Sequence, residues 1–151
     1  IRVPLILHWP ARIARSATCA VPVDCTDFYP TFCQLAGLTP PAEQAMDGLS
    51  LVPLLDNPSA TLPRPALYWH YPLDSPHFLG GRSSAANRKD DMKYIYFFDD
   101  GSEELYDLTE DASETTDLTT KLPEARKEHR VLLRNWITEV KGTVPEGQEM
   151  P

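Results

Sequence analysis

One run sets the fold of the second half of this chain: Met92-Lys93-Tyr94-Ile95-Tyr96-Phe97-Phe98-Asp99-Asp100-Gly101. Aromatic and aliphatic residues fill most of it, and such residues favour the pleated, half-buried surface of a β strand. Side chains alternate across a strand, so Tyr94, Tyr96 and Phe98 share one face while Ile95 and Phe97 share the other. The closing Asp-Asp-Gly is a turn signal. The run therefore predicts a strand over Met92–Phe98 that ends in a hairpin turn.

Similar short segments lie on both sides of this run. Ser83–Arg88 precedes it across the turn signal Asp90-Asp91, and Glu103–Leu108 follows it. A further strand candidate, Ala66–Tyr71, lies before a Gly-Gly loop. Strands joined by tight turns pair antiparallel, so these segments predict an antiparallel meander.

A single long helix is predicted after the meander, from Pro123 to about Lys141, with Gly142 at its end. Proline is tolerated in a first turn and glycine favours a helix stop. Its apolar stripe consists of Ala125, His129, Leu132, Leu133, Trp136, Ile137 and Val140. This stripe should pack on one face of the sheet, and residues 143–151 should form a tail.

The first half predicts one short amphipathic helix. Asp27 is placed as its N-cap, Phe28, Thr31, Phe32, Leu35 and Ala36 follow at helical spacing, and Gly37 marks the stop. A Pro-rich stretch from Asp56 to Pro65 is the expected subdomain boundary. The sequence thus predicts domains at 1–60 and 61–142, followed by a tail at 143–151.

The opening residues pose a packing problem. Val3–Leu7 is a continuous apolar run, which is typical of a parallel strand buried on both faces. Parallel pairing needs a crossover connection, and nothing nearby reads as a parallel neighbour. The run therefore predicts that the chain is the C-terminal part of a larger protein. In the chain alone, the uncovered strand would favour self-association.

Composition excludes some classes of partner. The chain has 22 acidic and 14 basic residues and a formal net charge of −8. Nucleic acids and anionic membranes select for clustered Lys and Arg, so neither is expected as a partner. The cysteines Cys19, Cys25 and Cys33 match no metal-binding spacing, although a Cys19–Cys25 disulfide stays possible.

His70 is the best candidate for a substrate-binding residue, because Trp69 and Tyr71 flank it at a predicted strand end. A packed or loop histidine is the alternative. His77, Arg82 and Arg88 could bind an anionic group, but they could also be solvated loop charges. The acidic pairs Asp90-Asp91 and Asp99-Asp100 fit turn geometry better than a metal site.

Six segments of the chain, taken in order, carry a family resemblance. They are Arg2-Val3-Pro4-Leu5-Ile6-Leu7-His8-Trp9-Pro10, Asp27-Phe28-Tyr29-Pro30-Thr31 with Leu35-Ala36-Gly37, Asp47-Gly48-Leu49-Ser50-Leu51 with Pro53-Leu54-Leu55, Leu67-Tyr68-Trp69-His70-Tyr71-Pro72, Arg88-Lys89-Asp90-Asp91-Met92-Lys93-Tyr94-Ile95, and Glu104-Leu105-Tyr106-Asp107-Leu108. Together they resemble the C-terminal part of a sulfatase, of the arylsulfatase type within the alkaline-phosphatase superfamily. Asp90 stands where that family usually has glycine, and Asp117 where it often has asparagine.

The resemblance implies an α/β to α+β fold. The last strand and helix region of a sulfatase α/β domain would be followed by a small antiparallel sheet packed with a C-terminal helix. It also places His70 near the substrate mouth, and it implies a periplasmic or secreted parent protein.

The resemblance further implies a sulfuric ester hydrolase acting on a sulfated carbohydrate or an aryl sulfate. In that family a formylglycine made from Cys or Ser attacks sulfur, and a calcium-like cation holds the sulfate. The nucleophile motif C/S-x-P-x-R lies upstream of the opening strand, and no cysteine of this chain fits it. The chain alone should therefore contain no catalytic residue, bind no calcium and be inactive.

Two other interpretations stay open. The parent protein could be a related phosphate- or phosphonate-ester hydrolase of the same superfamily. Alternatively, the chain could be a non-catalytic module that binds carbohydrate or another partner.

Overall fold

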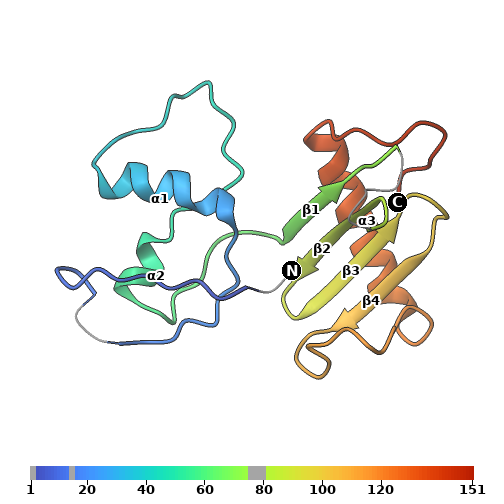
Figure 1. Ribbon diagram of the computed structural model, residues 1–151, viewed down its shortest axis with the longest axis horizontal. Coiled ribbons are helices and arrows are strands. Elements are labelled where there is room, and N and C mark those ends of the chain that lie inside the picture. Colours follow the sequence, from blue (N-terminus) through green and yellow to red (C-terminus); the bar gives the residue numbers. More distant parts are fainter. Residues whose placement is uncertain (1–2, 14–15, 75–80) are drawn as a thin grey trace. The chain divides into compact units, whose positions relative to one another are not determined.

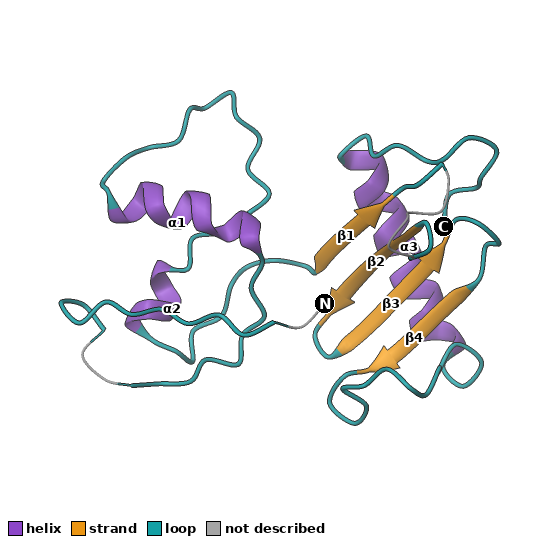
Figure 2. Cartoon of the chain, in the orientation of Figure 1, coloured by secondary structure: helices purple, strands orange, loops and turns teal. Residues whose placement is uncertain are grey.

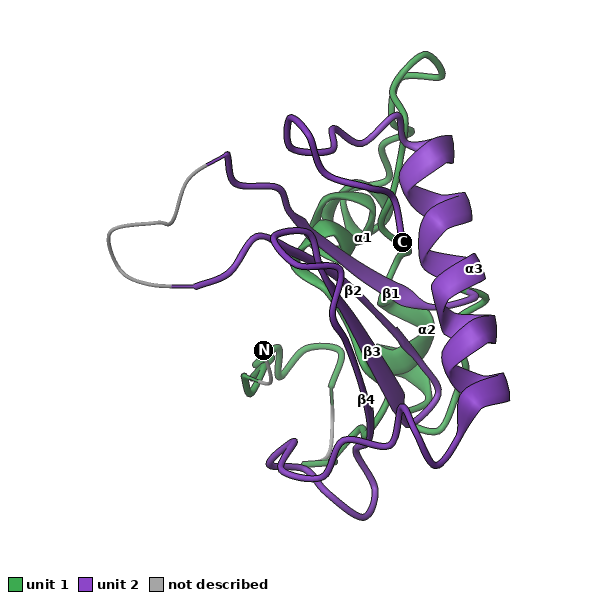
Figure 3. Ribbon diagram, turned by 90° about the vertical axis from the view of Figure 1, so that its right-hand side faces the viewer, with its two compact units in different colours: residues 1–64 green, residues 65–151 purple. Residues whose placement is uncertain are grey.

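Two compact units make up the chain, unit 1 at residues 1–64 and unit 2 at residues 65–151 (Figure 3). The structure is a computed structural model that describes residues 3–13, 16–74 and 81–151.

Unit 2 contains a four-stranded antiparallel sheet in which the strands follow chain order (Figure 1). The strands are β1 (Leu67–Tyr71), β2 (Ser84–Lys89), β3 (Met92–Phe97) and β4 (Glu103–Asp107). Asn87 of β2 lies opposite Tyr94 of β3, and Tyr94 lies opposite Leu105 of β4. The predicted meander is confirmed, with each strand end within one residue of its expected position.

The turn between β2 and β3 contains Asp90, which stands where glycine is expected from the family pattern. Asp90 has a backbone φ of 53°, in the left-handed region that glycine occupies without cost. Aspartate is among the few other residues that adopt this conformation readily. The residue that departs from the family pattern therefore still fits the turn.

Helix α3 (Pro123–Glu139) covers one face of this sheet (Figure 3). His129, Leu133 and Ile137 are its buried residues, as the helical stripe predicted, whereas Val140 is exposed. On the sheet, the facing side chains are those of Tyr94, Tyr96, Phe98 and Leu105, all of them buried. Burial of one large apolar side chain contributes roughly 1.5–3 kcal/mol, so this layer is the main source of stability in unit 2.

Polar contacts also fix α3 on the sheet. The buried Asn87 side chain donates to the His129 carbonyl over 2.8 Å, and its oxygen lies 2.6 Å from His129 Nδ1. Because burial disfavours the charged imidazole, the pKa of His129 is lowered. Glu103 of β4 forms ion pairs with Arg126 and Arg130 of the helix.

The other face of the sheet holds a buried cation. The Lys93 side chain is 8% exposed, and its Nζ lies 2.5 Å from Glu114 Oε2. A buried charge requires such a partner. Lys93 belongs to a segment that resembles the family pattern, and the structure gives it a structural role in this ion pair.

Residues 143–151 pack back onto unit 2. Val144 contacts the core cluster, and Pro145 is buried. Arg134 Nε donates to the carbonyl of Pro151 over 2.5 Å. This last segment therefore belongs to the packed unit.

Unit 1 contains the short turn η1 (Cys25–Asp27) and two helices, α1 (Phe28–Leu35) and α2 (Val52–Asp56) (Figure 2). Pro53 lies in the first turn of α2, where a missing N–H costs nothing. Long irregular segments connect these elements (Figure 2). Unit 1 therefore depends on specific side-chain ties more than on regular structure.

Asp27 is the central tie of unit 1. Its side chain is fully buried, and Oδ1 accepts hydrogen bonds from Leu49 N at 2.8 Å and from Arg64 at 2.7 Å. Oδ2 accepts from Asp24 N at 2.8 Å. The carboxylate thus makes no capping hydrogen bond to α1. The prediction that Asp27 is the N-cap residue of α1 is confirmed. Its side chain does not cap the helix, because Asp24 N, Leu49 N and Arg64 use both oxygens.

Gly48 is packed directly against the backbone of η1. A Cβ at this position would lie 2.1 Å from Thr26 O and 2.7 Å from Asp27 N. Real Cβ atoms do not approach backbone atoms so closely. Gly48 is therefore required by contact, and it lets Leu49 N reach the Asp27 carboxylate.

The predicted strand at Val3–Leu7 is wrong for this structure. Residues 3–9 are irregular, and no strand of the described chain pairs with them. A β strand exists only when a neighbour satisfies its peptide groups. The apolar composition of the run was visible in the sequence, but a neighbour is required before it becomes a strand.

No described helix is both long and apolar enough to cross a lipid bilayer.

Candidate functional site

His70, the predicted substrate-binding residue, lies on β1 with its ring turned toward α3. Its Nε2 is 2.6 Å from the carbonyl oxygen of Thr143. The ring lies edge-on to Phe98, with centroids 5.6 Å apart, and edge-on to Trp136 at 6.3 Å. A hydrogen bond and two aromatic contacts therefore fix the imidazole.

This arrangement assigns different roles to the two ring nitrogens. A carbonyl only accepts, so Nε2 carries the proton and donates to Thr143. Nδ1 is then an acceptor, and it is buried with no partner in the described part of the chain. The ring thus has one acceptor nitrogen that is enclosed by the surrounding side chains and unpaired within the described residues.

Glycine at position 142 makes room for this ring. A Cβ there would lie 3.3 Å from His70 Nε2 and 3.1 Å from the Ile137 side chain. The helix end and the imidazole are thus packed closely against each other. Sequence reasoning placed Gly142 at the helix stop, but it did not predict this contact.

The two candidate arginines are paired with acids of hairpin turns, Arg82 with the β3–β4 turn and Arg88 with the β2–β3 turn. Arg82 Nε lies 2.9 Å from Asp99, and its guanidinium lies 3.9 Å over the Phe97 ring. Arg88 donates to the Asp90 carbonyl at 3.0 Å and contacts Asp91. These pairs satisfy the guanidinium groups within the hairpins. His77 lies outside the described residues.

The acids of the second turn are held in their charged form. The hydrogen bond from Arg82 lowers the pKa of Asp99. Hydrogen bonds from Ser102 lower the pKa of Asp100 to about 2. Both carboxylates therefore stabilise the turn, as aspartates at turns often do.

Metal-binding geometry is not found in the described ranges 3–13, 16–74 and 81–151. No group of three or more His, Cys, Asp or Glu side chains there could hold a metal ion. The three cysteines are free thiols, and Cys19 and Cys25 are exposed. The disulfide that the sequence left possible is not present.

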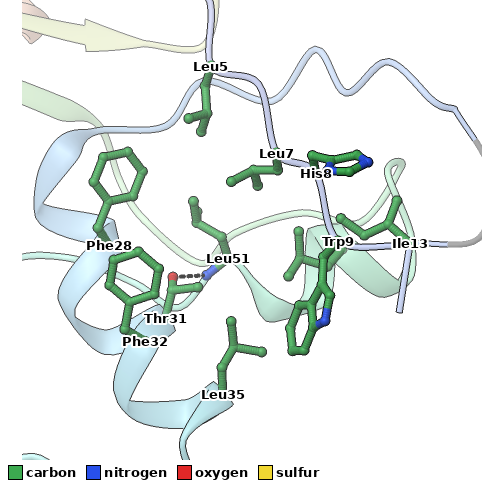
Figure 4. A pocket seen from close by; sticks show the side chains of 11 residues that line it. Leu5, Leu7, His8, Trp9, Ile13, Phe28, Thr31, Phe32, Leu35 and Leu51 are labelled. Atoms are coloured by element: carbon green, nitrogen blue, oxygen red, sulfur yellow. Dashed lines mark hydrogen bonds between the residues drawn. The ribbon is translucent and has the colours of Figure 1, made fainter. Parts of the chain in front are cut away.

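An apolar groove in unit 1 is a second candidate site, and sequence reasoning did not predict it (Figure 4). Its volume is about 420 Å³. One wall comes from residues near the start of the chain and the other from the helices. The lining residues are Leu5, Leu7, His8, Trp9, Ile13, Phe28, Thr31, Phe32, Leu35, Leu51 and Leu55. No charged carboxylate, lysine or arginine is among them, so the groove suits an apolar occupant.

The signal for this groove was present in the sequence in two separate pieces. Phe28, Phe32 and Leu35 form the apolar stripe of α1, and the run Val3–Leu7 lies far earlier in the chain. Only the folded chain shows that these two sets face each other (Figure 4).

Comparison with known families gives one match over most of the chain. Residues 1–140 match the family described as N-sulphoglucosamine sulphohydrolase, C-terminal. This match includes both units, the groove and His70.

Two curated relatives match along nearly the whole chain. A sulfatase of Formosa agariphila is 34% identical over 97% of this chain and 28% of its own length. An N-acetylglucosamine-6-O-sulfatase of Bacteroides thetaiotaomicron is 31% identical over 98% of this chain and 27% of its own length. The chain therefore spans little more than a quarter of the length of these relatives.

Solved structures show the same fold. A protein in complex with its substrate D-glucosamine-2-N,6-O-disulfate superposes with a TM-score of 0.67 at 30% identity, over 82% of this chain and 25% of its own. A phosphonate monoester hydrolase of Agrobacterium radiobacter superposes with a TM-score of 0.55 at 26% identity, over 75% of this chain and 24% of its own.

Proposed function

The chain belongs to the N-sulphoglucosamine sulphohydrolase C-terminal family of the sulfatases, and on this basis we propose that it is the C-terminal domain of a longer enzyme that hydrolyses sulfate esters. The observation that carries the proposal is the family match over residues 1–140. The share of the relatives' length that it spans, 27–28%, supports a longer parent enzyme.

In this proposal, the catalytic groups lie in the remainder of the longer protein. No Cys or Ser in the sequence opens a C/S-x-P-x-R motif, so the chain offers no residue that formylglycine could replace. A calcium-like cation would supply electrostatic stabilisation of the sulfate oxygens. The described residues hold no cluster that fits such an ion, so its ligands would also lie elsewhere.

We expect a clear contrast between the longer protein and the chain alone. The product of the complete reading frame, matured in a host that makes formylglycine, should hydrolyse 4-nitrophenyl sulfate or glucosamine 6-sulfate. Residues 1–151 alone should give no turnover above buffer and no tight calcium binding by calorimetry. Turnover by the chain alone would contradict the proposal that the catalytic groups lie in the remainder of the longer protein. Lack of sulfatase activity in the matured full product would contradict the proposed function.

The substrate class that we propose is a sulfated amino sugar. Its support is that one relative is an N-acetylglucosamine-6-O-sulfatase and one structural neighbour holds a glucosamine disulfate as substrate. An aryl sulfate is the alternative. The ratio of kcat/KM for glucosamine 6-sulfate and 4-nitrophenyl sulfate, measured on the longer protein, distinguishes the two.

His70 is proposed as the residue of this domain that contacts substrate. The support is the likeness of the Trp69-His70-Tyr71-Pro72 segment to one that the family places near the substrate mouth. In the described residues Nδ1 is buried and has no partner, so the proposal requires the longer protein to open this side of the ring to a sugar hydroxyl. In the longer protein, His70→Gln should raise KM about tenfold, the loss of one hydrogen bond of roughly 1.5 kcal/mol. The value of kcat should change little.

A purely structural role for His70 gives a different result. In that case His70→Gln would lower the melting temperature through the lost bond to Thr143 and leave KM unchanged. Gly142→Ala, which crowds the same ring without removing the acceptor, is the matched control. An unchanged KM in His70→Gln would contradict substrate contact.

A related phosphonate-ester hydrolase is the second candidate function. The structural likeness to a phosphonate monoester hydrolase at 26% identity is the observation in its favour. Hydrolysis of a phenylphosphonate monoester faster than of any sulfate ester by the longer protein would establish this alternative.

A further inference from the structure

His129 is a titratable residue enclosed in the core of unit 2. It lies on α3, its side chain belongs to a residue that is only 4% exposed, and its ring centroid is 6.4 Å from that of Tyr94 on β3. Neither the proposed reaction nor the proposed substrate contact uses it. Histidine changes its charge between about pH 5 and 8, so this residue is a place where acid can act on the fold.

The contacts with Asn87 determine which ring nitrogen of His129 carries the proton. The backbone carbonyl of His129 only accepts, so the Asn87 group 2.8 Å from it is the side-chain NH2. The Asn87 side-chain oxygen therefore faces His129 Nδ1, over 2.6 Å. This oxygen also only accepts, so Nδ1 holds the proton and donates it. The neutral ring thus takes up its next proton at Nε2.

A second proton would place a charge in a site whose facing groups are neutral. A buried charge requires an opposite charge that binds it. Asn87 on β2 is an uncharged amide, and Tyr94 on β3 stays uncharged because burial raises the pKa of its hydroxyl. Burial accordingly lowers the pKa of His129.

The charged residues closest to His129 largely offset one another. Glu128 precedes it on α3 and lies 2.5 Å from Lys89 of β2. Glu128 raises the pKa of the imidazole and Lys89 lowers it, and the contribution of Asp90, which raises it, is smaller than either. All three effects are smaller than that of burial.

Glu103 of β4 also faces α3, but it is bound by Arg126 and Arg130. It is not among the groups that shift the pKa of His129. The interface between α3 and the sheet therefore supplies no free carboxylate to a charged His129 ring within the described residues.

We propose that the Asn87–His129 pair is an acid-sensitive latch, which holds α3 on the sheet while the imidazole is neutral and releases it when Nε2 takes up a proton from solvent. An unfolded histidine has a pKa of about 6.5, and in the folded unit this pKa is lower. The stability that the latch provides is therefore complete above about pH 6.5 and is lost as the pH falls toward the folded value.

Release of α3 would reach the His70 ring as well. Trp136 of α3 lies edge-on to that ring, and the carbonyl of Thr143, just beyond the helix end, accepts its hydrogen bond. Both contacts depend on a docked helix, so acid would weaken substrate binding at His70. This consequence rests on the proposed function, whereas the latch itself does not.

Hydrogen exchange of the α3 amides tests the latch without any assay of activity. In the longer protein, their protection factors, corrected for the pH dependence of intrinsic exchange, should fall several-fold from about pH 7.5 to about pH 5.5. The limit for one proton over this range is about tenfold. Amides of α1 in unit 1 are the reference within the same molecule.

His129→Asn is the decisive variant. Its amide keeps a donor at the place of Nδ1 but takes up no proton, so the decline should be smaller than about twofold. His70→Gln is the matched control, because it removes another imidazole of unit 2 and should leave the decline intact.

Asn87→Asp should reverse the sign of the effect. A carboxylate that faces Nδ1 favours the imidazolium and raises the pKa of His129. A raised pKa provides stability that is present at low pH and lost as the pH rises. Protection of α3 in this variant should therefore rise between about pH 7.5 and about pH 5.5.

Three outcomes would overturn the proposal. They are a lack of decline in the unsubstituted protein, an equal decline in His129→Asn, and a decline that His70→Gln abolishes and His129→Asn does not. If His129→Asn does not fold, an unchanged decline in Asn87→Asp overturns it instead. A longer protein that shows the expected pattern but hydrolyses no sulfate ester would leave the latch intact and contradict only the proposed function.

Discussion

Gly48→Ala is expected to unfold unit 1 and leave unit 2 folded. A Cβ at position 48 would lie 2.1 Å from Thr26 O and 2.4 Å from Thr26 C, both backbone atoms. Backbone atoms cannot move aside as the end of a flexible side chain can. Relief would require η1 to separate from Gly48, which would remove Leu49 N from the Asp27 carboxylate. We expect a loss of more than about 4 kcal/mol, at the upper end for single substitutions.

Exchange of amides in α1 and α2 measures this effect, with amides of α3 as the reference within the same molecule. Gly37→Ala is the matched control. Gly37 has a φ of 69°, yet a Cβ there would meet nothing within 4 Å. Its cost should be only about 1–2 kcal/mol, that of a left-handed non-glycine residue. Similar effects of the two substitutions would contradict the claim that close approach makes Gly48 necessary.

Asp27→Ala is expected to cost about 3–5 kcal/mol, because it leaves the Arg64 guanidinium without its buried partner. The same change removes the acceptor for Leu49 N and Asp24 N. Urea unfolding followed by exchange of the α1 amides would measure this loss. Asp27→Asn keeps the shape and one acceptor oxygen, so it should cost less.

Asp56→Ala is the matched control for Asp27→Ala. Asp56 also pairs with an arginine of unit 1, Arg12 at 2.9 Å, but its side chain is 57% exposed. Exposed ion pairs contribute only about 0–1 kcal/mol. If Asp27→Ala costs no more than Asp56→Ala, then the buried carboxylate does not hold unit 1 together.

Unit 2 could be predicted from the sequence because its signals are local. Short turns such as Asp90-Asp91 join β2 to β3 and β3 to β4, and each strand pairs with the next along the chain. The stripe of α3 follows from helical spacing alone. The structure confirms both predictions. They succeeded because neither required knowledge of a distant contact.

The errors in unit 1 have one physical cause, which is that long-range partners decide the outcome. Asp27 is the N-cap residue of α1, as its sequence context predicts, but Leu49 N and Arg64, 22 and 37 residues away, bond its Oδ1 in place of a helix amide. Val3–Leu7 has the composition of a buried strand, but pairing depends on a neighbour. Composition indicates that a residue needs to be buried or hydrogen-bonded, but it does not identify the partner residues.

From the sequence, His70 could be identified as a candidate, but the residues that surround it could not. His70 was singled out by its aromatic neighbours in sequence, and its substrate-binding role stays a prediction. Its actual surroundings come from Thr143, 73 residues later, and from Trp136 of α3. The assignment of its two nitrogens therefore required the structure.

The order of strands in unit 2 has a consequence for folding kinetics. Every strand of the sheet pairs with its neighbour along the chain. The β2–β3 and β3–β4 pairings close only short turns, and hairpins of this kind form in about 1–10 μs. Proteins rich in such local contacts fold quickly. The bond between His70 and Thr143 spans 73 residues and can form only after α3 has docked. During synthesis it is therefore one of the last contacts of unit 2 to close, once Thr143 has left the ribosome.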